Sequence, residues 1–336
     1  MRRGGASFVT VAVMAAFVLF PLVFSNPTTT SIAFFALVYM VAATAWNVFS
    51  GLSGYIALGH AVFFGSGAYT LAVAAEKLHI GAGWTPFALV PLAGAVAAAI
   101  AIPFGLIALR TRRHTFVVIT IAIFFIFQLL AFNLSFTGGS SGLQTPFPLW
   151  TAVGYNQRFY YVALAILVAT VAVAIVVRRS RLGLQLLAIR DDEDRALGLG
   201  VRTRRVKLFA FTLSAIPVGM VGAVYTYYLG QIFPQFAFDP LFDITVALMA
   251  FFGGLATIAG PLLGALVLES MQQEFTLRFS AGGGIYLIVY GALFLVVILV
   301  MPRGIVPTLR DALVTLRARR KGRVGLPVQT PLRSRP

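Results

Sequence analysis

The chain has 336 residues, 59% of them hydrophobic and only 11% charged, and its mean hydropathy is +0.91. Soluble domains carry about a quarter charged residues, so this composition argues against a soluble domain and predicts an all-α, polytopic integral membrane protein. The net charge of +16 indicates basic loops on the cytoplasmic side of a membrane rather than nucleic-acid binding, and the absence of cysteine excludes disulfides, thiol catalysis and cysteine metal sites.

The apolar runs predict about ten membrane-spanning or half-spanning helices, because a spanning helix needs roughly 20 apolar residues. The first run follows Met1-Arg2-Arg3 and resembles a signal peptide. It is long for one and no small-residue cleavage site follows, so we expect an uncleaved helix. The predicted helices cover residues 6–24, 31–49, 55–75, 84–109, 115–134, 159–177, 208–230, 244–255, 258–268 and 285–301.

The positions of the basic residues predict the orientation of these helices. With both termini in the cytoplasm, all Lys and Arg residues except Lys77, Arg158 and Arg278 fall on the cytoplasmic side. This arrangement requires an even number of crossings, so residues 244–268 must either cross twice or form a re-entrant hairpin. Ten crossings is our expectation, and eight crossings with one re-entrant loop is the alternative.

Two glycine-rich stretches, at residues 51–67 and 253–264, predict broken or re-entrant segments. Broken backbone at membrane depth persists only where protein or a water-filled cavity covers it. Close helix packing is the favoured explanation of each single glycine in the first stretch, but Gly59, Gly65 and Gly67 together surround the polar His60, which favours a pathway here.

The sequence divides into four parts by composition. Residues 1–177 form an N-terminal transmembrane half, 178–207 a charged cytoplasmic loop, 208–302 a C-terminal transmembrane half, and 303–336 a basic cytoplasmic tail. The loop predicts two short helices, the second capped by Asp191, which would form a rigid knob able to fit a groove on a cytoplasmic partner. A solvated loop that only obeys the charge rule is the alternative.

No catalytic or nucleotide-binding motif is present. A P-loop needs Gly-Lys-Ser/Thr, and none of Lys77, Lys207 and Lys321 can complete it. Ionisable groups are scarce in the predicted helices: Asp239 and Asp243 are expected in an outer loop, and Glu269 is the single intramembrane candidate. We therefore expect a transport protein, not an enzyme, whose energy comes from another chain. An ion-coupled secondary carrier or a channel for small solutes is the alternative.

Several motifs resemble the M-type permease subunits of ABC importers for branched-chain amino acids. The similar segments run from about residue 33 to residue 305 in the family's order. They are Gly59-His60-Ala61, Phe63 to Tyr69, Thr137 to Leu143, Arg181-Leu182-Gly183, Ala188 to Glu193, Lys207 to Phe211, Gly253-Gly254-Leu255, Gly260-Pro261 with Gly264, and Pro302-Arg303-Gly304. Tyr55 and Ala57 depart from the pattern, because the family often has Gln and Ser there.

The resemblance implies an inner-membrane permease of a bacterium, surrounded by lipid and paired with a second homologous permease. It further implies two cytoplasmic ATPase subunits that bind ATP and Mg²⁺, an extracytoplasmic solute-binding protein, and no cofactor in this chain. The residues expected to couple to an ATPase are Arg181, Gly183, Ala188, Arg190, Asp191, Asp192, Glu193 and Gly198. The residues expected along the substrate pathway are Asn47, Tyr55, Gly59, His60, Phe64, Gly253 and Gly254.

Overall fold

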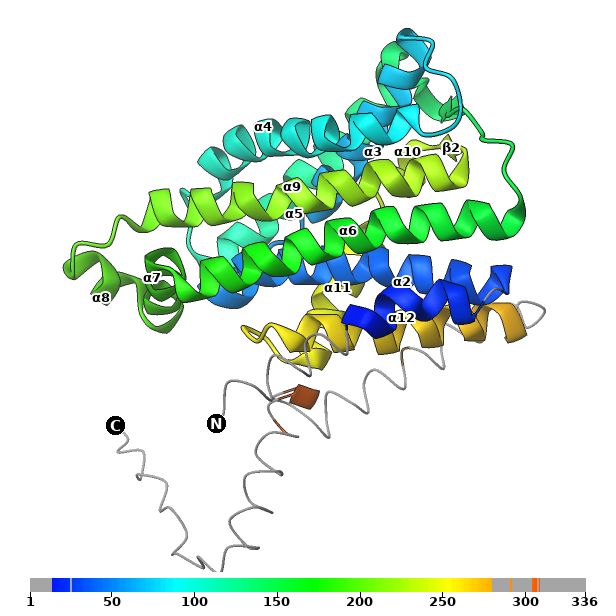
Figure 1. Cartoon of the computed structure of the whole chain (residues 1–336). Helices are drawn as coiled ribbons and strands as arrows, with labels where there is room; N and C mark the ends of the chain where they lie inside the picture. The colour runs from blue at the N-terminus through cyan, green and yellow to red at the C-terminus, as the bar shows by residue number, and fades with distance from the viewer. Residues whose placement is uncertain (1–13, 25, 280–290, 292–303, 307, 309–336) are drawn as a thin grey trace, which may run out of the picture.

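The computed structural model describes residues 14–24, 26–279, 291, 304–306 and 308 (Figure 1). The predicted helix 285–301, the start of the first helix and most of the basic tail lie outside these residues. The long helices are α2 (Pro27–Trp46), α3 (His60–Lys77), α4 (Val90–Ala108), α5 (Arg113–Asn133), α6 (Ala152–Arg179), α9 (Thr203–Leu229), α11 (Pro240–Gly253) and α12 (Ala259–Phe279). The shorter elements are the helix Met14–Val23, η1 (Asn47–Gly51), η2 (Thr85–Leu89), η3 (Ser135–Thr137), η4 (Gly139–Ser141), β1 (Leu143–Gln144), α7 (Arg181–Asp191), α8 (Glu193–Gly198), β2 (Gln231–Ile232) and α10 (Pro234–Ala237).

The prediction of an all-α membrane protein is confirmed. Within the described residues, 6 helical segments are long and apolar enough to cross a membrane. The strands are one antiparallel pair of two residues each, in which Leu143 of β1 faces Ile232 of β2.

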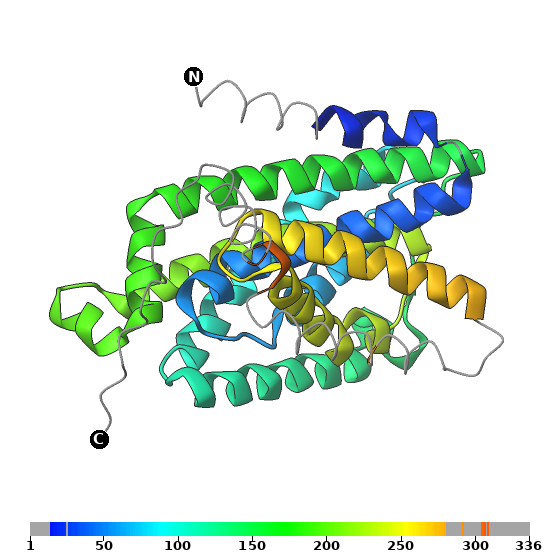
Figure 2. The same ribbon diagram turned by 90° about the horizontal axis from the view of Figure 1, so that it is seen from below.

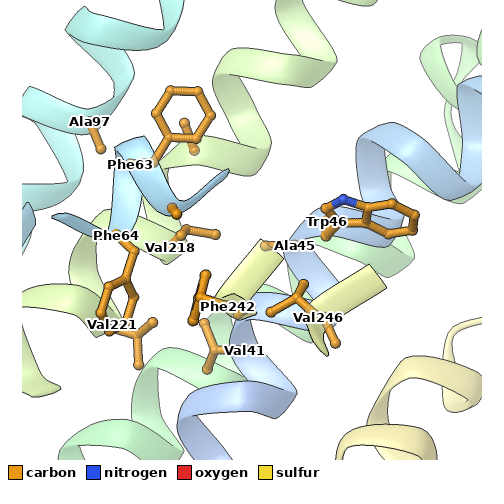
Figure 3. Packing of buried hydrophobic residues seen from close by; sticks show 14 of the residues in the cluster. Val41, Ala45, Trp46, Phe63, Phe64, Ala97, Val218, Val221, Phe242 and Val246 are labelled. Carbon is orange, nitrogen blue, oxygen red and sulfur yellow. The ribbon is translucent and has the colours of Figure 1, made fainter. Parts of the chain in front are cut away.

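The helix α9 is central to the core and packs against both α3 and α4 (Figure 1). Small residues allow this close approach: a Cβ added to Gly67 would lie 2.0 Å from the carbonyl oxygen of Gly219. Figure 3 shows buried apolar side chains that α2, α3, α4, α9 and α11 contribute to one cluster, among them Val41, Ala97 and Val218. The helix α2 connects this cluster to α6 and α12 (Figure 2).

The helices define two ends of the molecule. At one, which we call the basic end, α7 and α8 meet the turn between α4 and α5, and Arg113 donates to the carbonyl oxygens of Ile189 and Arg190. The other, which we call the opposite end, holds the β1–β2 pair, where the backbone N–H of Thr145 donates to the carbonyl oxygen of Gly230. Figure 1 shows α7 and α8 projecting from the left side of the bundle.

The chain leaves helical geometry at both predicted breaks. After α2 comes the π-helix η1, and α3 starts only at His60, not at the predicted Tyr55. At the second break, α11 ends at Gly253 and α12 starts at Ala259. The helix α12 extends to Phe279, well beyond the predicted 268, and it packs against α2.

The second break makes α11 and α12 a hairpin that returns to the opposite end. Its turn lies beside Asn47, near the basic end of α2. Farther along α12, Leu266 and Ser270 share a cavity with Thr29 in the first turn of α2. Residues 240–279 therefore enter and leave at one end of the bundle, as expected both of two crossings and of a re-entrant hairpin.

The predicted scarcity of buried ionisable groups is wrong. Asp243 is not in an outer loop but inside α11, with 2% of its surface exposed, and Glu269 and Lys207 are also buried. The error arose at the start of α11. Asp239 caps the helix and Pro240 occupies its first turn, so it begins before the apolar run that the hydropathy pattern detects.

Candidate coupling site

The helix α7 turns back tightly on the end of α6. Ser180 accepts a hydrogen bond from the backbone N–H of Gly183 and so caps α7. A Cβ on Gly183 would lie 2.3 Å from the carbonyl oxygen of Val177, so any side chain here would push α7 away from α6. Leu186 and Ile189 bury the inner face of α7.

The cap of α8 is Asp192 rather than the predicted Asp191, which is the last residue of α7. The Asp192 side chain accepts from the backbone N–H of Arg195 at 3.0 Å, and this hydrogen bond lowers the pKa of the Asp192 carboxyl. Asp191 cannot take this role because the chain has not yet left helical geometry there. The helix α8 ends at Gly198.

A buried cluster of Glu193, Lys207 and Tyr55 attaches α8 to the bundle. Lys207 donates to the Glu193 carboxylate at 2.6 Å and to the Tyr55 hydroxyl at 3.0 Å, and Tyr55 in turn donates to Glu193. Partial burial raises the pKa of Glu193, but the hydrogen bonds from Lys207 and Tyr55 outweigh it and hold the pKa below its usual value. The carboxylate is therefore charged at neutral pH and paired with the ammonium.

Two arginines of the α4–α5 turn add unequal contacts. Arg113 donates to two carbonyl oxygens at the end of α7, at 3.0 and 2.6 Å, where a cation also complements the helix dipole. Arg112 pairs with Asp194 at 3.1 Å, but both side chains are exposed, so we assign this pair little stabilisation.

Three leucines are exposed on this knob, which is formed by α7 and α8. Leu184, Leu197 and Leu199 are 65%, 50% and 84% exposed, although they lie in the most highly charged segment of the chain. Of the predicted coupling residues, Arg181, Asp191 and Gly198 are exposed beside these leucines. Gly183 is buried and Ala188 is half-buried, so they position the knob rather than form its surface.

Arg190 connects the knob to the first break. Its guanidinium donates to the carbonyl oxygen of Gly51, the last residue of η1, at 2.9 Å. The loop that follows is fixed by buried side chains: Trp46 donates to the carbonyl oxygen of Ala57, and Thr120 accepts from the backbone N–H of Leu58. The broken backbone is thus covered by protein and hydrogen-bonded.

Polar side chains also hold the start of α3. His60 lies 3.0 Å from the Ser214 hydroxyl, measured from its Nε2, and Asp243 accepts from the backbone N–H of Ala61 at 3.0 Å. Ser214 donates to the carbonyl oxygen of Phe211, so His60 Nε2 is the donor in the His60–Ser214 pair. Asn47 contacts the other break, where its amide binds Ala256 and Thr257.

The predicted pathway residues are all buried within this chain. Tyr55 belongs to the Glu193 cluster, Gly59 lies against the ring of Phe104, and Phe64 packs against Phe242 with tilted rings whose centroids are 4.5 Å apart. Gly253 faces the backbone of Gly260, where α11 and α12 cross. None of the predicted pathway residues lines the apolar cavity of about 540 Å³ that lies between α3, α4 and α5. Their role in transport stays a prediction.

Sequence reasoning did not identify two buried charged residues near the breaks, Asp243 and Lys207, as site residues. Asp243 had no usable signal, because its partner Ala61 is 182 positions away. Lys207 had a signal in the sequence: it is the last cation of α9 and stands directly before the apolar run that follows, where an unpaired charge would be costly.

Comparison with known proteins places the chain in a family. A family model described as "Branched-chain amino acid transport system / permease component" matches residues 28–298. The high-affinity branched-chain amino acid transport system permease protein LivM of Escherichia coli (strain K12) is 28% identical, over 93% of this chain and 77% of that protein. LivM of Salmonella typhimurium is 28% identical over 87% of this chain and 73% of that protein.

A second relative is the permease protein LivH of the same E. coli system, 26% identical over 80% of this chain and 90% of that protein. No solved structure matches the chain at a significant level. The family match covers most of the chain and agrees with its apolar helices. The chain therefore belongs to the family of branched-chain amino acid transport permease components.

Proposed function

We propose that this chain is a permease subunit of an ATP-driven importer and that it translocates branched-chain or related amino acids. In this proposal it pairs with a second homologous permease, receives solute from an extracytoplasmic binding protein, and is driven by two ATPase subunits that bind ATP and Mg²⁺. The similarity to both LivM and LivH supports the pairing, because those two permease proteins carry the name of one transport system in E. coli.

The proposed orientation puts the basic end in the cytoplasm of a bacterial cell and both termini on that side. The turn between α4 and α5 carries Arg110, Arg112 and Arg113, and α7 and α8 lie beside it. The positive-inside rule favours this orientation.

The observation that carries the proposal is the anchored knob with its exposed leucines. Hydrogen bonds from Lys207 and Arg113 hold α7 and α8 in one orientation. Leu184, Leu197 and Leu199 remain open to a partner. An anchored apolar surface at the cytoplasmic end supports docking of an ATPase, because a force applied to the knob reaches the bundle through these contacts.

Ion-coupled transport is a second candidate, favoured by Glu269. One of its carboxylate oxygens is buried and lacks a hydrogen-bond partner within the described part of the chain. A buried acid of this kind is typical of proton or cation relays. The two candidates differ in their dependence on ATP and on ion gradients.

Docking is tested by replacing one exposed leucine of the knob. We expect Leu197→Glu to reduce co-purification of the ATPase subunit and ATP-driven uptake together, while the permease stays folded in the membrane. The matched control is Leu149→Glu at the opposite end, a position that is 98% exposed. Equal ATPase binding by Leu197→Glu and the unaltered protein would refute docking at this surface.

A further inference from the structure

The two breaks in the membrane helices are joined by one side chain. The amide nitrogen of Asn47 donates to the carbonyl oxygen of Thr257 at 2.8 Å, and its amide oxygen accepts from the backbone N–H of Ala256 at 2.9 Å. The partners are more than 200 positions apart in sequence. Asn47 thus binds the turn of the α11–α12 hairpin with both ends of its amide.

The same short segment is held on its other side by the knob. Asn47 begins the π-helix η1 and Gly51 ends it, and the carbonyl oxygen of Gly51 accepts from Arg190 of α7 at 2.9 Å. Three segments distant in sequence are therefore connected in series, from α7 through η1 to the hairpin turn. π-Helical turns are rare and are often found at functional sites.

Gly51, Asn47 and Ala256 are packed closely where η1 meets the hairpin turn. A Cβ on Gly51 would lie 1.9 Å from the Asn47 amide oxygen and 3.1 Å from the backbone nitrogen of Ala256. On the turn itself Ala256 has φ of 57°, a left-handed conformation that costs energy for a residue with a side chain. The hydrogen bonds to Asn47 offset that cost and fix the turn in this shape.

We propose that Asn47 is a positioning residue that transmits movement of α7 to the α11–α12 hairpin during transport. The inference rests on the proposed function, since it assumes that an ATPase moves α7. Apolar contacts between α2 and α11, such as Trp46 beside Phe251, hold the helices together. Such contacts are not directional, so they do not fix the position of one helix along the other. The paired hydrogen bonds of Asn47 specify position, so the turn must follow η1 when Arg190 moves it.

The chain offers a matched control for this residue. Asn156 in α6 is as buried as Asn47, at 7% against 6% exposure. It also makes two hydrogen bonds with its amide, to the carbonyl oxygen of Pro27 and from the hydroxyl of Tyr228. Asn156 lies at the opposite end, away from the knob, so its loss affects stability without touching the proposed link.

The experiment uses distances between spin labels in the full transporter complex in lipid nanodiscs. The sequence has no cysteine, so labels are placed at will. One pair joins Leu92 of α4 to Gln185 of α7, and a second joins Leu92 to Leu263 of α12. Both pairs are measured without nucleotide and with ATP, and uptake per ATP hydrolysed is measured in vesicles.

In the protein with Asn47 intact, we expect both distances to change on addition of ATP. In Asn47→Ala the Gln185 distance still changes, the Leu263 distance does not, and uptake per ATP falls by at least about fivefold. Asn156→Ala retains both changes. If Asn47→Ala does not fold, Asn47→Asp takes its place, because a carboxylate cannot donate to Thr257.

Two results would count against the inference. If the Leu263 distance changes equally in Asn47→Ala and in the unaltered protein, with uptake per ATP within twofold, Asn47 is not the link. If neither distance responds to ATP in the unaltered protein and uptake does not need ATP, the proposed function fails and the inference fails with it.

Discussion

The side chain of Asp243 in α11 accepts a hydrogen bond from the backbone N–H of Ala61 in the first turn of α3, at 3.0 Å. The start of a helix leaves N–H groups without partners, and in a membrane no water is available to satisfy them. A carboxylate from a neighbouring helix fills this role because Gly59, which precedes α3, has no side chain to do so.

We predict that Asp243→Ala lowers the free energy of unfolding by about 1–3 kcal/mol, because it leaves a buried N–H unsatisfied. Asp243→Asn keeps an oxygen at the same place and should cost less. Thermal unfolding in detergent measures both variants. If Asp243→Asn and Asp243→Ala lose the same unfolding free energy, the hydrogen bond to Ala61 is not what stabilises the protein.

Gly183→Ala should displace α7 from α6 without unfolding the membrane helices, because the added Cβ would lie 2.3 Å from the carbonyl oxygen of Val177. We expect ATP-driven uptake to fall about tenfold or more at normal protein levels. Gly81→Ala, outside the knob, is the control, since nothing lies within 4 Å of its Cβ. The prediction is wrong if both variants transport alike.

Glu193→Gln should destabilise the protein by about 3 kcal/mol, because it leaves the buried ammonium of Lys207 without a charged partner. The double variant with Lys207→Met should recover most of this loss, and unfolding of the two single variants and the double variant measures the coupling. Additive losses would indicate that the two residues act separately.

The same pair predicts a pH dependence. The pKa of Glu193 is lowered in the folded protein, so its contribution to stability is complete at neutral pH and is lost as the pH falls through the lowered pKa. Glu193→Gln should lack this part of the acid transition when unfolding is followed against pH.

Gly67→Ala should separate α3 from α9, because its Cβ would lie 2.0 Å from the carbonyl oxygen of Gly219 and backbone cannot move aside cheaply. We expect a loss of folded protein in the membrane. Gly81→Ala, with nothing within 4 Å, should be tolerated. Normal yield and stability of Gly67→Ala would contradict the close packing of these helices.

Hydropathy and glycine spacing in the sequence predicted the membrane class, the helical knob and the two breaks, because these depend on local composition. The positions of single residues at the breaks did not follow. Asp243 binds Ala61, which lies 182 positions earlier, and Asn47 binds a turn more than 200 positions later. Such pairings depend on how the helices pack, and no local pattern in the sequence encodes them.

The sequence also could not decide whether Asp191 or Asp192 caps α8. Both residues are suitable caps, and the choice depends on where α7 ends. That end is set by Arg113, which binds the last carbonyl oxygens of α7 from the α4–α5 turn. A contact with another segment thus decided the register of a short local helix.

The central claim is that transport through this permease is driven by ATP at the basic end. The most direct measurement is uptake of radiolabelled leucine into vesicles that contain the whole complex, with ATP enclosed on the α7–α8 side. We predict accumulation that requires this ATP and persists when ionophores abolish all ion gradients. Uptake that proceeds without ATP and disappears with the ionophores would contradict the account.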